Sequence, residues 1–304
     1  MFFAVSPMLA NVYPPGAELA SGELGFWNIL LAVLSFGLTA VMLPLLCKLV
    51  VAAGFVRPNY RGKSIPQGVG VTFFLVPVLL GPLVLVALPS PAARLQFAAF
   101  LATAGAMSFL GLLDDVFGSR QASGLKGHFT ALLRGQLTTG ALKALGGLAV
   151  AFFASLATAP AKEVLLNTLI IALAANAINL LDLRPGRAGK GYLLGAVPLL
   201  AAGWSQPAFI LPLSIVTGVM LAYLPGDLRA RVMMGDAGAN VLGATLGLTA
   251  VWVLGLGAKA AVLAFLVLFH LFTERYSLTE VMRRNRLLHF LDQLGRPGEE
   301  PGEK

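Results

Sequence analysis

Residues 94–115 read RLQFAAFLATAGAMSFLGLLDD, an apolar run that ends in two adjacent aspartates. An apolar run of about twenty residues is long enough to cross a membrane as a helix. The whole chain has this character, because 57% of its residues are hydrophobic, only 12% are charged and the mean hydropathy is +0.82. A soluble domain of 304 residues could not cover so much apolar surface. The composition therefore predicts a membrane protein with several spanning helices.

The apolar runs predict an all-α polytopic bundle of nine spans, and two short runs, 191–204 and 258–273, leave eight or ten open. The expected spans are 27–50, 68–89, 94–113, 138–159, 163–181, 191–204, 207–224, 237–255 and 258–273. Residues 1–273 are expected to form one membrane domain. Residues 274–294 place apolar and basic residues at helical spacing, which predicts an amphipathic helix on the membrane surface, and the tail to 304 is expected to fray.

Lysine and arginine are divided unequally between the two sides of this bundle. Arg94, Lys162 and Lys259 fall on one side, and the other 19 of the 22 fall on or near the opposite side. Because basic loops stay in the cytosol, the N-terminus is predicted outside and the C-terminus inside. The net charge of +8 is then a topology signal and not a sign of nucleic-acid binding. The single cysteine, Cys47, excludes an intrachain disulfide or a cysteine-rich metal site.

Acidic residues gather at the ends of the predicted spans. Five of the six aspartates stand where apolar runs meet basic loops: Asp114, Asp115, Asp182, Asp227 and Asp236. A carboxylate at the membrane boundary usually has a cation or a substrate as its partner. Asp114 and Asp115 also lie at a helix C-terminus, where the macrodipole disfavours negative charge. A bound divalent cation would remove that conflict, and an ion pair with Arg120 or Lys126 is the alternative.

A polar stripe runs along the predicted span 163–181. Asn176, Asn179 and Asp182 recur every three residues and so share one face of the helix. Asparagines can hold membrane helices together, but the aspartate at the end of the stripe favours a substrate or metal site. Asp236 precedes the span 237–255, where it is expected to act as an N-cap, as a metal ligand, or as both.

Basic residues and glycines of the same loops could bind an anionic substrate. The candidate phosphate ligands are Arg57, Arg61, Lys63, Arg120, Lys126, Arg134, Arg184, Arg187 and Lys190. Gly68 and Gly70 follow the first basic loop, where a backbone anion site and a plain turn are both open. Gly238, Gly243 and Gly247 are expected to let helices pack closely.

Four segments together resemble the polyprenyl-phosphate sugar-1-phosphate transferases, the glycosyl transferase family 4 that contains phospho-N-acetylmuramoyl-pentapeptide transferases and N-acetylglucosamine relatives. The segments are Pro66–Gln67–Gly68–Val69–Gly70, Leu113–Asp114–Asp115, Asn176–Ala177–Ile178–Asn179–Leu180–Leu181–Asp182 and Met234–Gly235–Asp236–Ala237–Gly238. The likeness extends over about residues 27–273. It implies that a polyprenyl phosphate attacks the β-phosphate of a nucleotide sugar, typically a uridine diphosphate sugar, at the cytosolic face of a bacterial inner membrane.

The resemblance also implies roles for individual residues. Mg²⁺, or Mn²⁺ in its place, would be held by Asp236 with Asp115. Asp114, Asp115 and Asp182 would be the catalytic carboxylates. Asn179 and Asp182 would face the nucleotide. Apart from the resemblance, the residues themselves predict that Asn176, Arg184, Arg187, Lys190, Lys63 and Lys126 contact the substrate. The packing glycines suit a homodimer and internal contacts equally.

This chain departs from the family in two places. The run that begins at Asp182 is rich in glycine and aspartate in better-known members, but here it continues with Arg184, Arg187 and Lys190. The late histidine-rich loop is missing, and the basic stretch 274–294 stands where a tenth span is expected. A divergent transferase is the favoured interpretation. A non-catalytic relative that binds a polyprenyl lipid, and a flippase or transporter, are the alternatives.

Overall fold

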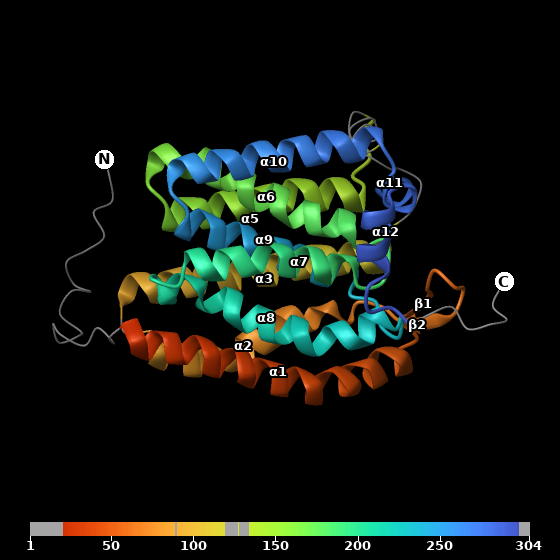
Figure 1. The fold of residues 1–304 in the computed structure, drawn as a ribbon, viewed down its shortest axis with the longest axis horizontal. Coiled ribbons are helices and arrows are strands. Elements are labelled where there is room, and N and C mark those ends of the chain that lie inside the picture. The colour runs from red at the N-terminus through yellow and green to blue at the C-terminus, as the bar shows by residue number, and fades with distance from the viewer. Residues whose placement is uncertain (1–20, 89, 119–126, 128–133, 298–304) are drawn as a thin grey trace.

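The computed structural model describes residues 21–88, 90–118, 127 and 134–297. Within them, nine long helices form a bundle, which confirms the all-α prediction (Figure 1). They are α1 (Ser21–Ala52), α2 (Thr72–Ala87), α3 (Pro91–Phe117), α5 (Thr139–Thr158), α6 (Val164–Leu181), α7 (Arg187–Ala202), α8 (Pro207–Leu228), α9 (Gly235–Val253) and α10 (Leu256–Arg275).

Seven helices of the described part are long and apolar enough to cross a membrane: α1, α2, α3, α5, α6, α8 and α10. Helix α7 has 16 residues, which is short for a span. Helix α9 is rich in glycine, alanine and threonine, and it lies in the middle of the bundle against α3, α6, α7 and α8. The described residues therefore contain the predicted number of helices. Two of these helices, α7 and α9, are not among those that are long and apolar enough to cross a membrane.

Glycines of α9 allow this central packing, as the sequence predicted. A Cβ added at Gly247 would lie 2.7 Å from the Cα of Ile171 on α6, and one at Gly243 would overlap the backbone of Ala174. Gly238 is similarly close to Gly70, because a Cβ added at Gly238 would lie 2.8 Å from the Cα of Gly70. Any side chain at these positions would push α9 away from its neighbours.

A small hairpin, absent from the sequence prediction, precedes α2. Strand β1 (Val56–Pro58) pairs antiparallel with β2 (Ser64–Pro66), and a 3-10 turn, η2 (Val69–Val71), follows. The Gly70 N–H donates to the carbonyl of Met234 at 3.2 Å, so this backbone amide holds the segment before α9. The strands are too short for an alternating pattern to reveal, which is why the region was predicted as a loop.

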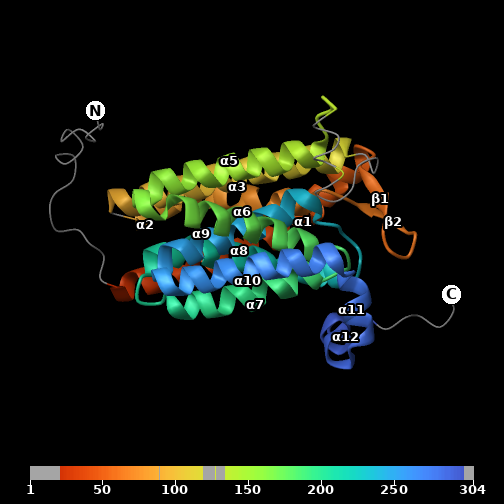
Figure 2. The same cartoon turned by 90° about the horizontal axis from the view of Figure 1, so that it is seen from above.

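The chain after α10 forms two short helices, α11 (Leu278–Arg284) and α12 (Arg286–Gln293). The break falls at Asn285, whose extended backbone ends α11 and whose side chain accepts the N–H of Leu288 at 3.1 Å to cap α12. Both views place these helices at the same end of the bundle as the β1–β2 hairpin (Figures 1 and 2). A second short connection, η3 (Ala161–Glu163), precedes α6.

Candidate active site

The carboxylate of Asp115 joins the end of α3 to the start of α9. Its Oδ1 accepts the N–H of Asp236 and its Oδ2 accepts the N–H of Ala237, both at 3.1 Å. The side chain of Gln67 donates a third hydrogen bond at 3.1 Å. The unfavourable dipole of α3 at Asp115 is thus offset by the favourable N-terminus of α9. Asp236 is not an N-cap, because Met234 holds that position and Asp115 satisfies the free N–H groups from another helix.

The sequence analysis missed Lys143, which lies one turn inside α5. Its Nζ donates to Asp114 Oδ2 at 3.1 Å and forms a close ion pair with Asp236 Oδ2. About a fifth of each of these three side chains is exposed. A lysine inside an apolar span was the available signal, because such a charge usually has a partner and a function. The lysine therefore links carboxylates that are far apart in the sequence.

Asn179 completes the contacts around Lys143. With its amide oxygen toward the lysine, Asn179 accepts from Lys143 Nζ at 3.1 Å and donates to Asp236 Oδ1 at 2.8 Å. Asn176 lies exposed on α6, one turn earlier, outside these hydrogen bonds. Asp114, Asp115, Lys143 and Asp236 thus form a cluster of charged side chains, to which Asp182 is added below. Asn179 of the predicted stripe contacts this cluster, and Asn176 does not.

Asp182 follows α6 and adds a further carboxyl group to this end of the bundle. Burial, together with the charges of Asp227, Asp236 and Asp115, raises the pKa of Asp182 well above its usual range, although the Gly235 N–H partly offsets the rise. Asp227 accepts the N–H of Gly186 at 3.0 Å. Lys143 pairs with Asp114 and Asp236, so this one lysine lies among four carboxyl groups, those of Asp114, Asp115, Asp182 and Asp236.

The donor set of this cluster is suitable for a hard cation. Aspartate and asparagine oxygens are the ligands that Mg²⁺ prefers, and a bound dication would offset the repulsion between carboxylates that lie this close together. Among the described residues, no three His, Cys, Asp or Glu side chains are already arranged around a metal position. The Lys143 ammonium lies between Asp114 and Asp236, and Asp115 is engaged by three N–H donors. Asp236 is engaged as well, by Lys143 and Asn179, so a metal held by Asp236 would have to replace one of these partners.

The predicted basic ligands have different surroundings. Arg187 is buried and binds Asp292 through two hydrogen bonds of 2.9 Å, while Lys190 donates to the carbonyl of Leu291 at 2.8 Å. Arg184 lies over the ring of Tyr60, 5.2 Å from its centre. Lys63 is exposed on the hairpin, and Lys126 lies outside the described residues. Arg187 and Lys190 thus contact the C-terminal helices, which the sequence analysis did not foresee.

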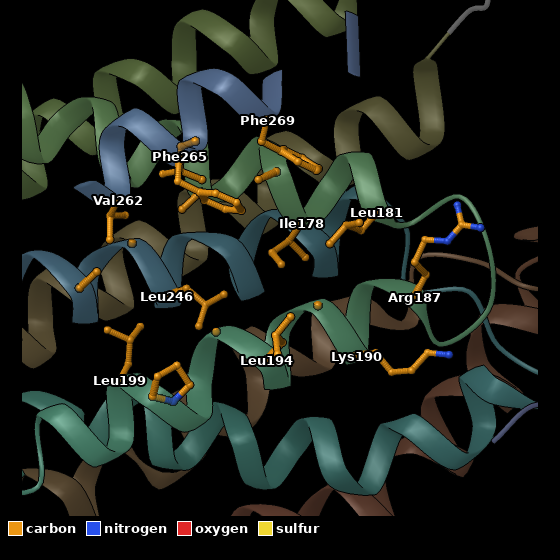
Figure 3. A pocket seen from close by; sticks show the side chains of 18 of the residues that line it. Ile178, Leu181, Arg187, Lys190, Leu194, Leu199, Leu246, Val262, Phe265 and Phe269 are labelled. Atoms are coloured by element: carbon orange, nitrogen blue, oxygen red, sulfur yellow. The ribbon is translucent and has the colours of Figure 1, made fainter. Parts of the chain in front are cut away.

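An apolar cavity of about 860 Å³ lies between α6, α7, α9, α10 and the C-terminal helices. Arg187 and Lys190 stand at one end, and apolar side chains line the rest (Figure 3). Leu181, next to Asp182 in the chain, belongs to its wall. The labelled apolar lining comprises Ile178, Leu181, Leu194, Leu199, Leu246, Val262, Phe265 and Phe269.

Comparison with known proteins identifies the family. A model of glycosyl transferase family 4 matches residues 97–254, which is just over half of the chain, and the chain belongs to this family. The match runs from α3 to α9 and so contains every carboxylate of the cluster. A phospho-N-acetylmuramoyl-pentapeptide-transferase of Thermotoga neapolitana is 29% identical over 203 residues, 64% of this chain and 63% of that protein. The chain therefore spans less than two thirds of this relative's length.

Proposed function

We propose that this protein transfers a sugar-1-phosphate from a nucleotide sugar to a polyprenyl phosphate, with Mg²⁺ or Mn²⁺, in cell-envelope glycan synthesis. The observation that carries the proposal is the contact of Lys143 with Asp114 and Asp236, which gathers α3, α5 and α9 around one charged centre. Both substrates are anionic, so transfer between them requires cationic groups and a metal to neutralise charge. Family membership supports the same class of reaction.

The reaction forms one phosphorus–oxygen bond and breaks another. An oxygen of the lipid phosphate bonds to the β-phosphorus of the donor, and the bond from that phosphorus to the bridging oxygen breaks. The nucleoside monophosphate leaves with the bonding electrons. A phosphate monoester is largely ionised at neutral pH, so no side chain needs to remove a proton from it.

The residues of the cluster take distinct roles in this proposal. Asp236 and Asp182 hold the metal, which when bound neutralises charge on the transferred phosphate. Lys143 stabilises negative charge in the transition state, and Asp114 with Asn179 orients its ammonium. Asp115 fixes the first turn of α9 and with it the position of Asp236. Lys63 and Arg184, near the hairpin, remain candidates for contact with the nucleotide.

The apolar cavity supplies a place for the lipid in the same proposal. An isoprenoid chain needs an apolar wall and gains about 25 cal/mol per Å² of apolar surface that it buries. The cavity lies between helices, and its lining includes Leu181, the neighbour of Asp182 in the chain. We further propose a bacterial inner-membrane location, with the cluster, the hairpin and the C-terminal helices in the cytosol. The charge distribution supports this orientation.

The identity of the released nucleotide tests the reaction class. Purified protein is incubated with polyprenyl phosphate, Mg²⁺ and a panel of uridine diphosphate sugars, and lipid and nucleotide products are separated by mass spectrometry. We expect a sugar-diphospho-lipid and a nucleoside monophosphate, and no product with a chelator. Release of a nucleoside diphosphate would indicate glycosyl transfer instead. No product with any donor, from folded protein that binds the lipid, would favour the non-catalytic interpretation.

A further inference from the structure

The C-terminal helices are fastened to the main bundle through one buried carboxylate. Asp292 on α12 accepts two hydrogen bonds of 2.9 Å from Arg187, and the hydroxyl of Thr279 on α11 accepts another from Arg187 at 3.1 Å. Arg296 approaches Asp292 from the following turn, at 2.9 and 3.3 Å. Burial by itself raises the pKa of Asp292, but the hydrogen bonds and charges of the two arginines outweigh it and lower the pKa. Asp292 is therefore a satisfied, ionised centre of this contact.

The two arginines that contact Asp292 also fix the turn that follows Asp182. Arg296 Nε donates to the carbonyl of Pro185 at 2.8 Å, and Arg187 is held by Asp292. The N–H of Gly186, between them, donates to Asp227 from the opposite side. Three consecutive residues of the turn are thus fixed by atoms from distant parts of the chain.

Packing around Leu228 strengthens this arrangement. Gly186 has a φ of +73°, and an added Cβ there would overlap the Leu228 side chain. A Cβ added at Gly295, beyond α12, would lie 3.2 Å from the same leucine. Leu228, at the end of α8, is therefore in contact with both the turn and the end of the C-terminal segment. Lys190 adds a hydrogen bond to Leu291, near the C-terminal end of α12, where a cation is favoured.

We propose that Asp292 is a positioning residue, through which the C-terminal helices hold the 182–187 turn and keep the Asp182 carboxylate at the catalytic cluster. The inference rests on the proposed transferase function, because it assigns Asp182 to the reacting centre. In this account Arg187 and Lys190, two of the three basic residues after Asp182, serve to dock α12. The two departures of the chain from its family, the basic run and the altered C-terminus, are then parts of one contact.

The test compares Asp292→Asn with wild type and with Glu280→Gln. Glu280 is a matched control, since it lies on α11 and, within the described part of the chain, pairs with exposed arginines of the same helix, Arg283 and Arg284. Hydrogen exchange of residues 182–190 and steady-state transfer per folded molecule are measured on the full-length protein. We expect faster exchange in this segment for Asp292→Asn, and a fall in kcat of roughly tenfold or more with a smaller change in KM. Asp292→Glu should recover part of the loss, and Glu280→Gln should match wild type.

Several results would overturn the positioning role. Unchanged exchange in Asp292→Asn would show that the turn does not depend on Asp292. Faster exchange with unchanged kcat per folded molecule would leave Asp292 as a purely structural anchor. If the wild type transfers no sugar phosphate, the proposed function fails by itself, and exchange at 182–190 still decides whether Asp292 holds the turn. Should Asp292→Asn not fold, Arg296→Gln, which removes the Pro185 contact, is measured in the same way.

Discussion

Asp115, at the end of α3, accepts the backbone N–H of Asp236, at the start of α9, at 3.1 Å. The contact sets two family motifs against each other although 121 positions separate them in the chain. One carboxylate thus caps the helix that presents the other. This relationship explains how Asp236 is oriented toward Lys143, and several expectations depend on it.

Replacing Asp115 with asparagine should weaken both folding and transfer. An amide presents only one acceptor oxygen, so one N–H of α9 loses its partner at a cost of about 1–3 kcal/mol. We expect a lower unfolding temperature and loss of transfer in Asp115→Asn, with Glu280→Gln unchanged in both. Wild-type transfer by Asp115→Asn would remove Asp115 from the account of the site.

Lys143 should be required for chemistry more than for folding. Lys143→Met keeps the length and apolar character of the side chain but removes the charge between Asp114 and Asp236. We expect kcat to fall by roughly a hundredfold or more, as when other stabilisers of transition-state charge are removed. Lys162→Met, at an exposed lysine near the start of α6, is the matched control and should retain activity. Equal kcat in the two variants would contradict the role given to Lys143.

Asp182 should make the metal-free protein less stable as pH rises. Its folded pKa lies well above the ordinary 3.8, so the folded state binds the proton more tightly than the unfolded state. Stability from this group is therefore full below the ordinary pKa and is lost as pH rises through the folded pKa. In a chelator at pH 8, Asp182→Asn should therefore unfold at a higher temperature than wild type. Thermal scans at pH 4 should show this difference shrinking, and a constant difference would oppose the assignment.

Gly243 should be needed for the contact between α9 and α6. Gly243→Ala would force a methyl group into the backbone of Ala174, and overpacking of this kind costs about 1–3 kcal/mol. Gly257→Ala is the control, because an added Cβ there meets no atom within 4 Å. We expect a lower folded yield and unfolding temperature only for Gly243→Ala, measured in detergent. Identical behaviour of the two variants would mean that α9 is less tightly packed than the structure shows.

The sequence was sufficient for the helices because apolar length and charge are local signals. The nine expected spans correspond to the nine long helices, and the glycines of α9 pack as predicted. The sequence could not predict contacts between side chains that are far apart in the chain. Lys143 meets Asp236 across 93 positions and Arg187 meets Asp292 across 105, and no periodicity connects such pairs. For the same reason, nothing local indicated that Arg187 and Lys190, which were predicted to bind the substrate, contact α12.

The most direct test of the central claim is transfer of labelled sugar phosphate by Asp236→Asn beside wild type, with Mg²⁺ and polyprenyl phosphate. Asparagine keeps the shape of the side chain but removes the charge that pairs with Lys143 and would hold the metal. The account predicts labelled lipid from wild type and from Glu280→Gln, and none above background from folded Asp236→Asn. Transfer by Asp236→Asn at the wild-type rate would contradict the assignment of this cluster as the catalytic centre.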